Sequence, residues 1–253
     1  MNPEVYFEMA AMQRSHWWFS GRREILASVL RTLSLAKTAE ILDAGCGTGA
    51  NLQLLAQFGN VTAIEPDETA RSLAKREMDC PILEGTLPAR LPFPRESFDL
   101  VCLLDVLEHI EDDAEALRSV FEVLKPGGIV LVTAPAYSWL WSAHDEAHRH
   151  YRRYTKTSLR RSLDQAGLET ERSGYFNTLL FPAIALIRLM GKLAQREPLS
   201  DAVLPPTWLN ALLHQCFALE RRILPGQFMP FGVSVIAIAH RPLTAVANSF
   251  PGR

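Results

Sequence analysis

The chain has 253 residues, of which 48% are hydrophobic and 21% are charged. This length allows one large domain with a buried core, and the composition excludes a largely disordered or collagen-like chain. With 26 basic and 28 acidic side chains the formal net charge is −2, which argues against a dedicated nucleic-acid-binding protein.

The spacing of the cysteines and the first residues of the chain indicate the cellular compartment in which the protein is expected. The four cysteines are far apart and form no Cys-x-x-Cys pair, so neither a structural zinc site nor a disulfide framework is expected. The first residues lack the basic segment and apolar run of a secretory signal. We therefore expect a cytoplasmic protein.

Short apolar runs rich in Val, Ile and Leu alternate with segments of helical periodicity. Such runs are typical of strands covered by helices on both faces of a sheet. The alternation predicts right-handed βαβ units and a doubly wound α/β sheet. Seven strands are predicted, at residues 40–43, 60–65, 81–84, 98–104, 128–134, 168–175 and 233–239.

The sequence pattern divides the chain into five parts. Residues 1–37 precede the first strand and have helical character, and residues 38–175 carry most of the sheet. Residues 176–230 interrupt the pattern with apolar helical segments and prolines, and 231–240 contain the final strand. Residues 241–253 have no periodicity and are expected to form a flexible tail.

The loop after the first strand is the most informative stretch. From Asp43 to Asn51 it reads Asp-Ala-Gly-Cys-Gly-Thr-Gly-Ala-Asn, where a strand passes into a helix. Open α/β sheets bind nucleotides at this position, and glycines let the backbone approach a ligand closely. Glu65 ends the second strand, where it can accept hydrogen bonds from ribose hydroxyls.

The glycine pattern alone also satisfies a dinucleotide fingerprint, so NAD would fit as well. Asp43 favours a different ligand. A helix N-terminus attracts a pyrophosphate because it is positive, and a carboxylate close by opposes that attraction. S-adenosylmethionine has no phosphate and carries an ammonium and a sulfonium, so the acidic residue favours S-adenosylmethionine over NAD.

Together with this loop, later segments resemble the class I S-adenosylmethionine-dependent methyltransferases across about residues 38–175. These segments are 63–67 (Ala-Ile-Glu-Pro-Asp), 91–93 (Leu-Pro-Phe), 97–101 (Ser-Phe-Asp-Leu-Val), 106–110 (Val-Leu-Glu-His-Ile) and 124–128 (Leu-Lys-Pro-Gly-Gly). The resemblance implies a Rossmann-like seven-stranded sheet with an antiparallel last strand. It also implies that the cofactor is S-adenosylmethionine.

By this resemblance, the glycine loop lines the methionine end of the cofactor, Glu65 holds the ribose and Pro66 lies beside the adenine. Many relatives have an Asp after the third strand, but Thr86 stands there in this chain. The adenine contact is therefore left open between Glu84 and backbone groups. The residues expected to bind the cofactor are Asp43, Ala44, Gly45, Cys46, Gly47, Asn51, Glu65, Pro66, Gly85, Thr86, Leu87, Leu104 and Asp105.

Methyl transfer from a sulfonium is an in-line displacement, so much of the catalysis can come from positioning the acceptor. A general base is needed only if the acceptor must lose a proton. Asp105 follows the fourth strand, with Glu108 and His109 close behind, although the latter two could simply cap and orient the next helix. Catalytic roles are expected for Asp105, His109, His150 and Tyr154.

The polar loop 144–154 follows the fifth strand and is dense in His, Arg and Tyr. A related His-x-Arg-Arg-Tyr pattern occurs in small-molecule methyltransferases, which favours acceptor contacts here, with His148 or His150 as a base. Its arginines suit a carboxylate or phosphate. Internal salt bridges would explain the pattern equally well. Its three histidines could bind a metal, but class I methyltransferases usually need none, and no metal is expected.

Residues 15–23, which read Ser-His-Trp-Trp-Phe-Ser-Gly-Arg-Arg, resemble a segment that precedes the fold in a bacterial subgroup of these enzymes. The segment is interpreted as a lid that shields the sulfonium from water, or as a helix packed against the sheet edge. The residues expected to bind the acceptor are Trp18, Arg22, His148, His150, Arg153 and Tyr154.

The apolar stretch 179–190 is broken by Pro182 and carries Arg188. It is shorter than the ~20 residues that a membrane-spanning helix needs. The insertion could cap an apolar acceptor, contact a membrane surface, form a dimer interface or pack as a core helix.

The sequence thus predicts an S-adenosylmethionine-dependent methyltransferase that acts on a small apolar or anionic acceptor. O-methylation is favoured over C- or N-methylation. Two other functions stay open at this point. One is an NAD-dependent oxidoreductase, and the other is a non-catalytic S-adenosylmethionine-binding module that uses the insertion as an interface.

Overall fold

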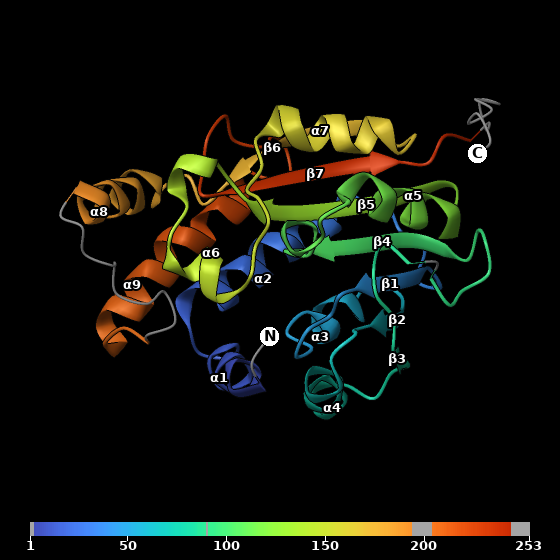
Figure 1. Ribbon diagram of the computed structural model, residues 1–253, viewed down its shortest axis with the longest axis horizontal. Coiled ribbons are helices and arrows are strands. Elements are labelled where there is room, and N and C mark those ends of the chain that lie inside the picture. The colour runs from blue at the N-terminus through green and yellow to red at the C-terminus, as the bar shows by residue number, and fades with distance from the viewer. Residues whose placement is uncertain (1–2, 90, 194–203, 244–253) are drawn as a thin grey trace.

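A seven-stranded sheet forms the centre of the computed structural model, which describes residues 3–89, 91–193 and 204–243 (Figure 1). The strand order is β3-β2-β1-β4-β5-β7-β6. The strands are β1 (Glu40–Ala44), β2 (Asn60–Ile64), β3 (Ile82–Leu83), β4 (Phe98–Leu104), β5 (Leu124–Pro135), β6 (Glu169–Phe176) and β7 (Ser234–His240).

Strands β1 to β5 pair in parallel, whereas β7 runs antiparallel to both β5 and β6. This confirms the doubly wound sheet with an antiparallel last strand. All seven predicted strands are present, but β5 begins at Leu124 rather than at residue 128. The earlier start follows from the pairing of Leu124 with Phe98, ahead of a register shift.

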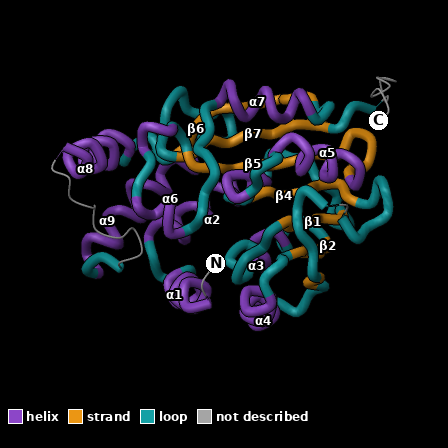
Figure 2. Tube along the Cα trace, in the orientation of Figure 1, coloured by secondary structure: helices purple, strands orange, loops and turns teal. Residues whose placement is uncertain are grey.

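Helices cover both faces of the sheet, as Figure 2 shows in purple. One hydrophobic core joins the sheet to α5 and α7, and the other joins it to α2, α3 and α9. The helices are α1 (Pro3–Met12), α2 (Trp17–Leu30), α3 (Leu52–Leu55), α4 (Glu68–Glu77), α5 (Asp113–Val123), α6 (Ala143–Ala147), α7 (Lys156–Gln165), α8 (Phe181–Leu193) and α9 (Thr207–Ala218).

Short polar side chains begin the helices that follow the strands. The Asp67 side chain accepts from the backbone N–H of Ala70 at the start of α4, 3.1 Å away. The Asp112 side chain accepts from Glu115 in the same way at the start of α5, at 2.9 Å. These N-caps satisfy backbone donors that have no partner within the helix. They therefore fix where the loops after β2 and β4 end.

The N-terminal helix α2 packs tightly on α9, which belongs to the insertion. A Cβ atom at Gly21 would lie 2.8 Å from Cδ1 of Phe217, so only glycine allows this approach. Within the segment 15–23, residues 17–23 thus belong to a helix, as one of the two interpretations expected, but this helix packs on α9 and on the central strands rather than on the sheet edge. That α2 also acts as a lid stays a prediction.

The insertion between β6 and β7 is helical in its described part and contains α8, α9 and a 3-10 helix (Leu219–Arg222). Residues 194–203 of the insertion and residues 244–253 of the predicted tail lie outside the described residues. Among the described residues, no helix is long and apolar enough to cross a membrane.

Candidate active site at the carboxyl edge of the sheet

A cavity of about 1000 Å³ opens at the carboxyl ends of β1, β2, β4 and β5. The strand order reverses between β1 and β4, and ligands of open α/β sheets bind in the crevice at such a point. Side chains from α1, α2, α8 and the loop after β5 complete the walls. Segments distant in the sequence therefore meet around one space.

The glycine loop after β1 lies against the cavity because its backbone adopts left-handed conformations. Gly45 has a φ of 90° and Gly47 a φ of 54°, which side chains other than glycine rarely adopt. A Cβ atom at Gly45 would lie 2.8 Å from Val106, whereas a Cβ at Gly47 would meet nothing within 4 Å. The loop thus packs closely on one side and leaves room for a ligand on the other.

Glu65 lines the cavity and holds the glycine loop in place. Its carboxylate accepts hydrogen bonds from the backbone N–H of Gly47 at 3.0 Å and of Asp67 at 3.1 Å. Burial raises the pKa of Glu65, and these two N–H groups partly offset that effect. The carboxylate is therefore fixed at the cavity wall, where its remaining lone pairs can meet hydroxyl groups.

Asp43 and Ala44 are buried at the end of β1 and do not line the cavity, although both were expected to bind the cofactor. Burial raises the pKa of Asp43 to about 7. Its Oδ2 atom has no hydrogen-bond partner among the described residues. A buried carboxylate with an unmet oxygen favours a cationic ligand nearby, and because Asp43 does not line the cavity it would act on such a ligand through charge rather than contact.

An ion pair joins α2 to the end of β4. The Arg22 guanidinium lies 2.9 Å from the Asp105 carboxylate and donates to Thr133 Oγ1 at 2.7 Å. Thr133 in turn donates to Asp105 at 3.0 Å, and the Trp18 ring covers the guanidinium. Trp18, Arg22 and Asp105, which were expected to contact the acceptor or the cofactor, all line the cavity.

The loop after β5 is anchored by Asp145, which is completely buried. Arg153 donates to both carboxylate oxygens of Asp145 at 2.8 Å, and Nδ1 of His150 lies 2.9 Å from Oδ1. These partners hold the pKa of Asp145 well below its usual range, although burial acts in the opposite direction. The loop therefore has the internal salt bridges of one interpretation, while His148, His150 and Arg153 also line the cavity.

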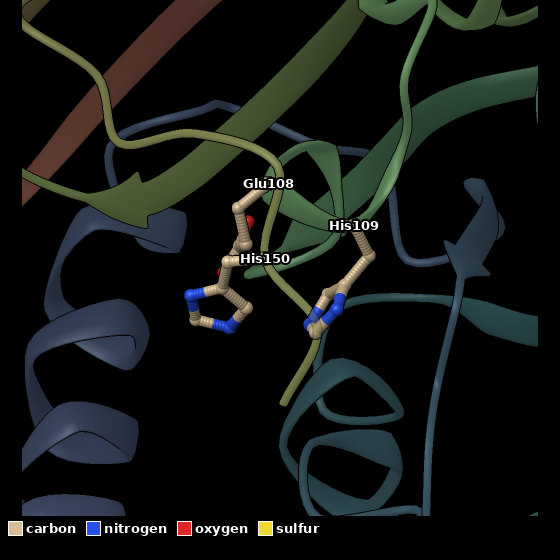
Figure 3. Close-up of side chains that lie close together, drawn as sticks. All are labelled: Glu108, His109 and His150. Atoms are coloured by element: carbon tan, nitrogen blue, oxygen red, sulfur yellow. The ribbon is translucent and has the colours of Figure 1, made fainter. Parts of the chain in front are cut away.

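Glu108, His109 and His150 come together at this end of the cavity (Figure 3). Their potential ligand atoms lie within 4.8 Å of one another. The two imidazole rings meet edge to face, with centroids 4.6 Å apart. Burial, followed by the neighbouring His150, lowers the pKa of His109 to about 4, so the His109 imidazole is neutral at pH 7.

Tyr154 corrects a prediction, because it does not line the cavity. Its side chain is 2% exposed and belongs to the core with α5 and α7. The hydroxyl donates to Asp113 at 2.8 Å, and the residue forms a β-bridge with Ala136. Tyr154 therefore packs in the core rather than at the cavity, which argues against contact with an acceptor bound there.

The remaining predicted residues line the cavity, whereas Glu84 does not. The Glu84 side chain is 78% exposed and pairs with Arg71 on the surface. Because Glu84 does not line the cavity, the structure argues against a contact between Glu84 and the adenine. The cavity-lining residues from the prediction are Trp18, Arg22, Gly45, Cys46, Gly47, Asn51, Glu65, Pro66, Gly85, Thr86, Leu87, Leu104, Asp105, His109, His148, His150 and Arg153.

Several cavity residues were not among those expected, and Glu108 is the most important of them. Its position beside His109 could have indicated a site residue. A Glu at this position, three residues after Asp105, is equally expected where a helix begins, so the sequence did not distinguish the two roles. Only the tertiary structure reveals its burial. The other additions come from α1, the glycine loop, the loop after β5 and α8, and include Tyr6, Thr48, Arg149, Ile184 and Arg188.

Residues 18–173 match the family model for a methyltransferase domain. The chain belongs to this family. A protein of Mycolicibacterium smegmatis described as a probable S-adenosylmethionine-dependent methyltransferase is 31% identical over 164 residues, which cover 63% of this chain and 62% of the relative. The mitochondrial ubiquinone biosynthesis O-methyltransferase of Schizosaccharomyces pombe is 31% identical over 47% of this chain and 46% of its own.

The fold is shared with a Bacillus halodurans protein described as a candidate methyltransferase. That structure has a TM-score of 0.60 and 21% identity, and the match covers 86% of this chain and 98% of the other. The chain spans less than two thirds of the length of the curated relatives named above. Family and fold confirm the resemblance to class I methyltransferases and argue against an NAD-dependent oxidoreductase. The bacterial subgroup stays a prediction.

Replacing Glu65 with Gln should weaken binding of S-adenosylmethionine by about 1–3 kcal/mol, because a hydrogen-bond acceptor with a full charge is lost. Isothermal titration calorimetry measures this change. Glu84→Gln is the matched control, because Glu84 lies outside the cavity. Equal losses in the two variants would contradict the placement of the ribose at Glu65.

Replacing Asp43 with Asn should weaken cofactor binding yet stabilise the cofactor-free protein at pH 8. The pKa of Asp43 rises from 3.8 to about 7 on folding, so above pH 7 the folded protein buries a charge that the unfolded chain exposes to water. Removing that charge should add on the order of 1–4 kcal/mol to the free energy of unfolding at pH 8.

The stabilisation should fall below about 1 kcal/mol near pH 4, where Asp43 is protonated in the folded protein and roughly 40% protonated in the unfolded chain. Urea unfolding of both proteins at the two pH values measures the difference. A variant that is less stable than the wild type at pH 8, or that binds the cofactor equally well, would contradict the role given to Asp43.

Proposed function

We propose that this protein transfers a methyl group from S-adenosylmethionine to an oxygen of a small amphipathic acceptor. The observation that carries this proposal is that the glycine loop and Glu65 line the same cavity as Glu108, His109 and His150. S-adenosylmethionine supplies an electrophilic methyl group on a sulfonium. The chain's own residues bind, orient and shield the reactants.

The cofactor end suits a nucleoside that carries positive charge. Glu65 is fixed for hydrogen bonds to the ribose hydroxyls, and Gly47 leaves the space that a ligand needs. Pro66 and the backbone near Thr86 line the wall where the adenine would lie. Asp43 contributes a buried negative charge, which favours the ammonium and sulfonium over a pyrophosphate.

The acceptor end suits an oxygen nucleophile. The neutral His109 imidazole and the Nε2 atom of His150, whose Nδ1 faces Asp145, can accept a proton or bind the acceptor hydroxyl. Ubiquinone biosynthesis O-methyltransferases among the relatives support oxygen as the methylated atom. Arg22, which is paired with Asp105, lies over the Trp18 ring at the same wall. The Trp18 ring would keep water from the reacting groups.

The lining indicates an acceptor that is both apolar and anionic. Trp17, Phe19 and Ile184 supply apolar surface, whereas Arg149 is an exposed cation at the cavity. Within the described chain, no side-chain ion pair or hydrogen bond neutralises Arg149. An unpaired guanidinium at this position suits a carboxylate or phosphate on the acceptor.

Hydroxylated aromatic acids with and without an alkyl chain provide the test, with methyl-labelled S-adenosylmethionine as donor. Arg149→Ala should raise KM for a carboxylated acceptor by about tenfold, as expected for the loss of one charge-assisted hydrogen bond, and leave kcat little changed. Arg160→Ala is the control, because Arg160 lies on α7 and pairs with Asp164. Cofactor binding without transfer to any acceptor would instead favour the non-catalytic module.

The outward face of α8 supports a second, separate proposal, contact with a lipid surface. Leu186, Ile187, Leu189 and Met190 are between 52% and 60% exposed. On the same helix, Ile184 lines the cavity. An apolar acceptor held in a membrane could therefore reach the cavity along one helix, and an exposed apolar face of this kind is typical of interfacial contacts.

Exchanging both Leu186 and Ile187 for Ser should abolish cosedimentation of the protein with phospholipid vesicles and leave its solution mass unchanged. The control is Leu243→Ser, because Leu243 is 80% exposed and follows the end of β7, which lies across the molecule from α8 (Figure 1). If the double variant changes only the mass in analytical ultracentrifugation, α8 is a dimer interface instead.

A further inference from the structure

We propose that Glu108, His109 and His150 bind a divalent transition-metal ion at the acceptor end of the cavity. The binding itself does not depend on the proposed function, whereas its consequence for the acceptor oxygen does. The proposal revises the expectation that no metal is present, because the structure brings together residues that are distant in the sequence.

The three side chains are close enough to share one ion. Glu108 and His109 belong to the 3-10 helix η1 (Leu107–His109) after β4, and His150 belongs to the loop after β5 (Figure 3). One ligand atom from each lies within 4.8 Å of the others. Ligands bound at about 2.0–2.2 Å from a metal lie roughly 3–3.5 Å apart, so small side-chain rotations complete the site.

The unpartnered carboxylate oxygen of Glu108 is a second observation, independent of the distances, that favours a bound cation. Its side chain is 1% exposed, yet it lines the cavity. Its Oε2 atom has no hydrogen-bond partner among the described residues. Burying a carboxylate oxygen without a partner costs several kcal/mol in general, and such groups in proteins commonly bind an ion or a ligand.

His150 already has the second partner that metal-binding histidines usually show. Its Nδ1 atom lies 2.9 Å from the buried carboxylate of Asp145, and Arg153 holds that carboxylate with two hydrogen bonds. This contact leaves Nε2 as the free nitrogen. A carboxylate that orients a histidine in this way sets the tautomer and strengthens the ligand.

Two of the arginines that line the cavity are each neutralised by their own carboxylate, which lowers their repulsion of a cation. Arg22 is paired with Asp105 and Arg153 with Asp145. Two imidazoles and one carboxylate, without a thiolate, suit Zn²⁺, Fe²⁺, Mn²⁺ or Co²⁺ and leave coordination positions open. A metal ion there would bind the acceptor hydroxyl and lower its pKa, which favours loss of its proton.

Titration of the chelator-treated full chain with Co²⁺ tests the proposal, because histidine-bound Co²⁺ absorbs visible light. We expect one saturable site in the wild type and at least about tenfold weaker binding in Glu108→Gln and His109→Gln. His240→Gln is the control, because His240 pairs with Glu171 away from the cavity. No saturable binding, or equal binding in all variants, would overturn the proposal.

A measurement on the wild type covers the case in which a variant does not fold. Co²⁺ should protect His109 and His150 from diethyl pyrocarbonate, read by mass spectrometry, and should leave His240 as reactive as before. Equal labelling with and without Co²⁺ would refute the metal site. Calorimetry with S-adenosylmethionine on the same wild-type samples separates this outcome from failure of the proposed function, because it measures cofactor binding without Co²⁺.

Discussion

The structure depends on how it accommodates the carboxylates at the carboxyl ends of its parallel strands. Asp105 is paired with Arg22, and Glu65 accepts backbone N–H groups. Asp43 and Glu108 each keep an oxygen atom without a partner among the described residues. Buried charge without compensation is costly, so a cationic ligand beside either carboxylate would stabilise the protein. Glu108 lines the cavity, whereas Asp43 is buried at the end of β1.

Helices outside the sheet form walls of the cavity at the carboxyl ends of the strands. Helix α2 brings Arg22 to Asp105, and its Gly21 lets α9 pack closely against it. Helix α8 is held from the other side, because Arg188 donates to the backbone carbonyl of Leu140. The N-terminal segment and the insertion thus close the cavity together, although they lie at opposite ends of the sequence.

Most of the residues that local patterns indicated as cofactor-binding line the cavity. Glycines that adopt positive φ angles and an acid at the end of the next strand follow one another along the chain, so their pattern can be recognised without knowledge of tertiary contacts. The acceptor end was predicted less well. From the sequence, Tyr154 was expected to be a site residue because it lies near His150. In the structure it forms a β-bridge with Ala136 and its side chain is buried in the core. Glu108 reads as a helix-capping residue, yet it is buried at the cavity wall.

The sequence by itself determined the order of strands and helices, the glycine loop and the position of Glu65, because hydrophobic periodicity and backbone geometry act over short distances. Only the tertiary structure decided which polar groups find partners. His150 meets Glu108 and His109 because β4 and β5 are neighbours whose carboxyl ends reach the same edge. Burial and pairing of charges are properties of the packed chain, and no local pattern specifies them.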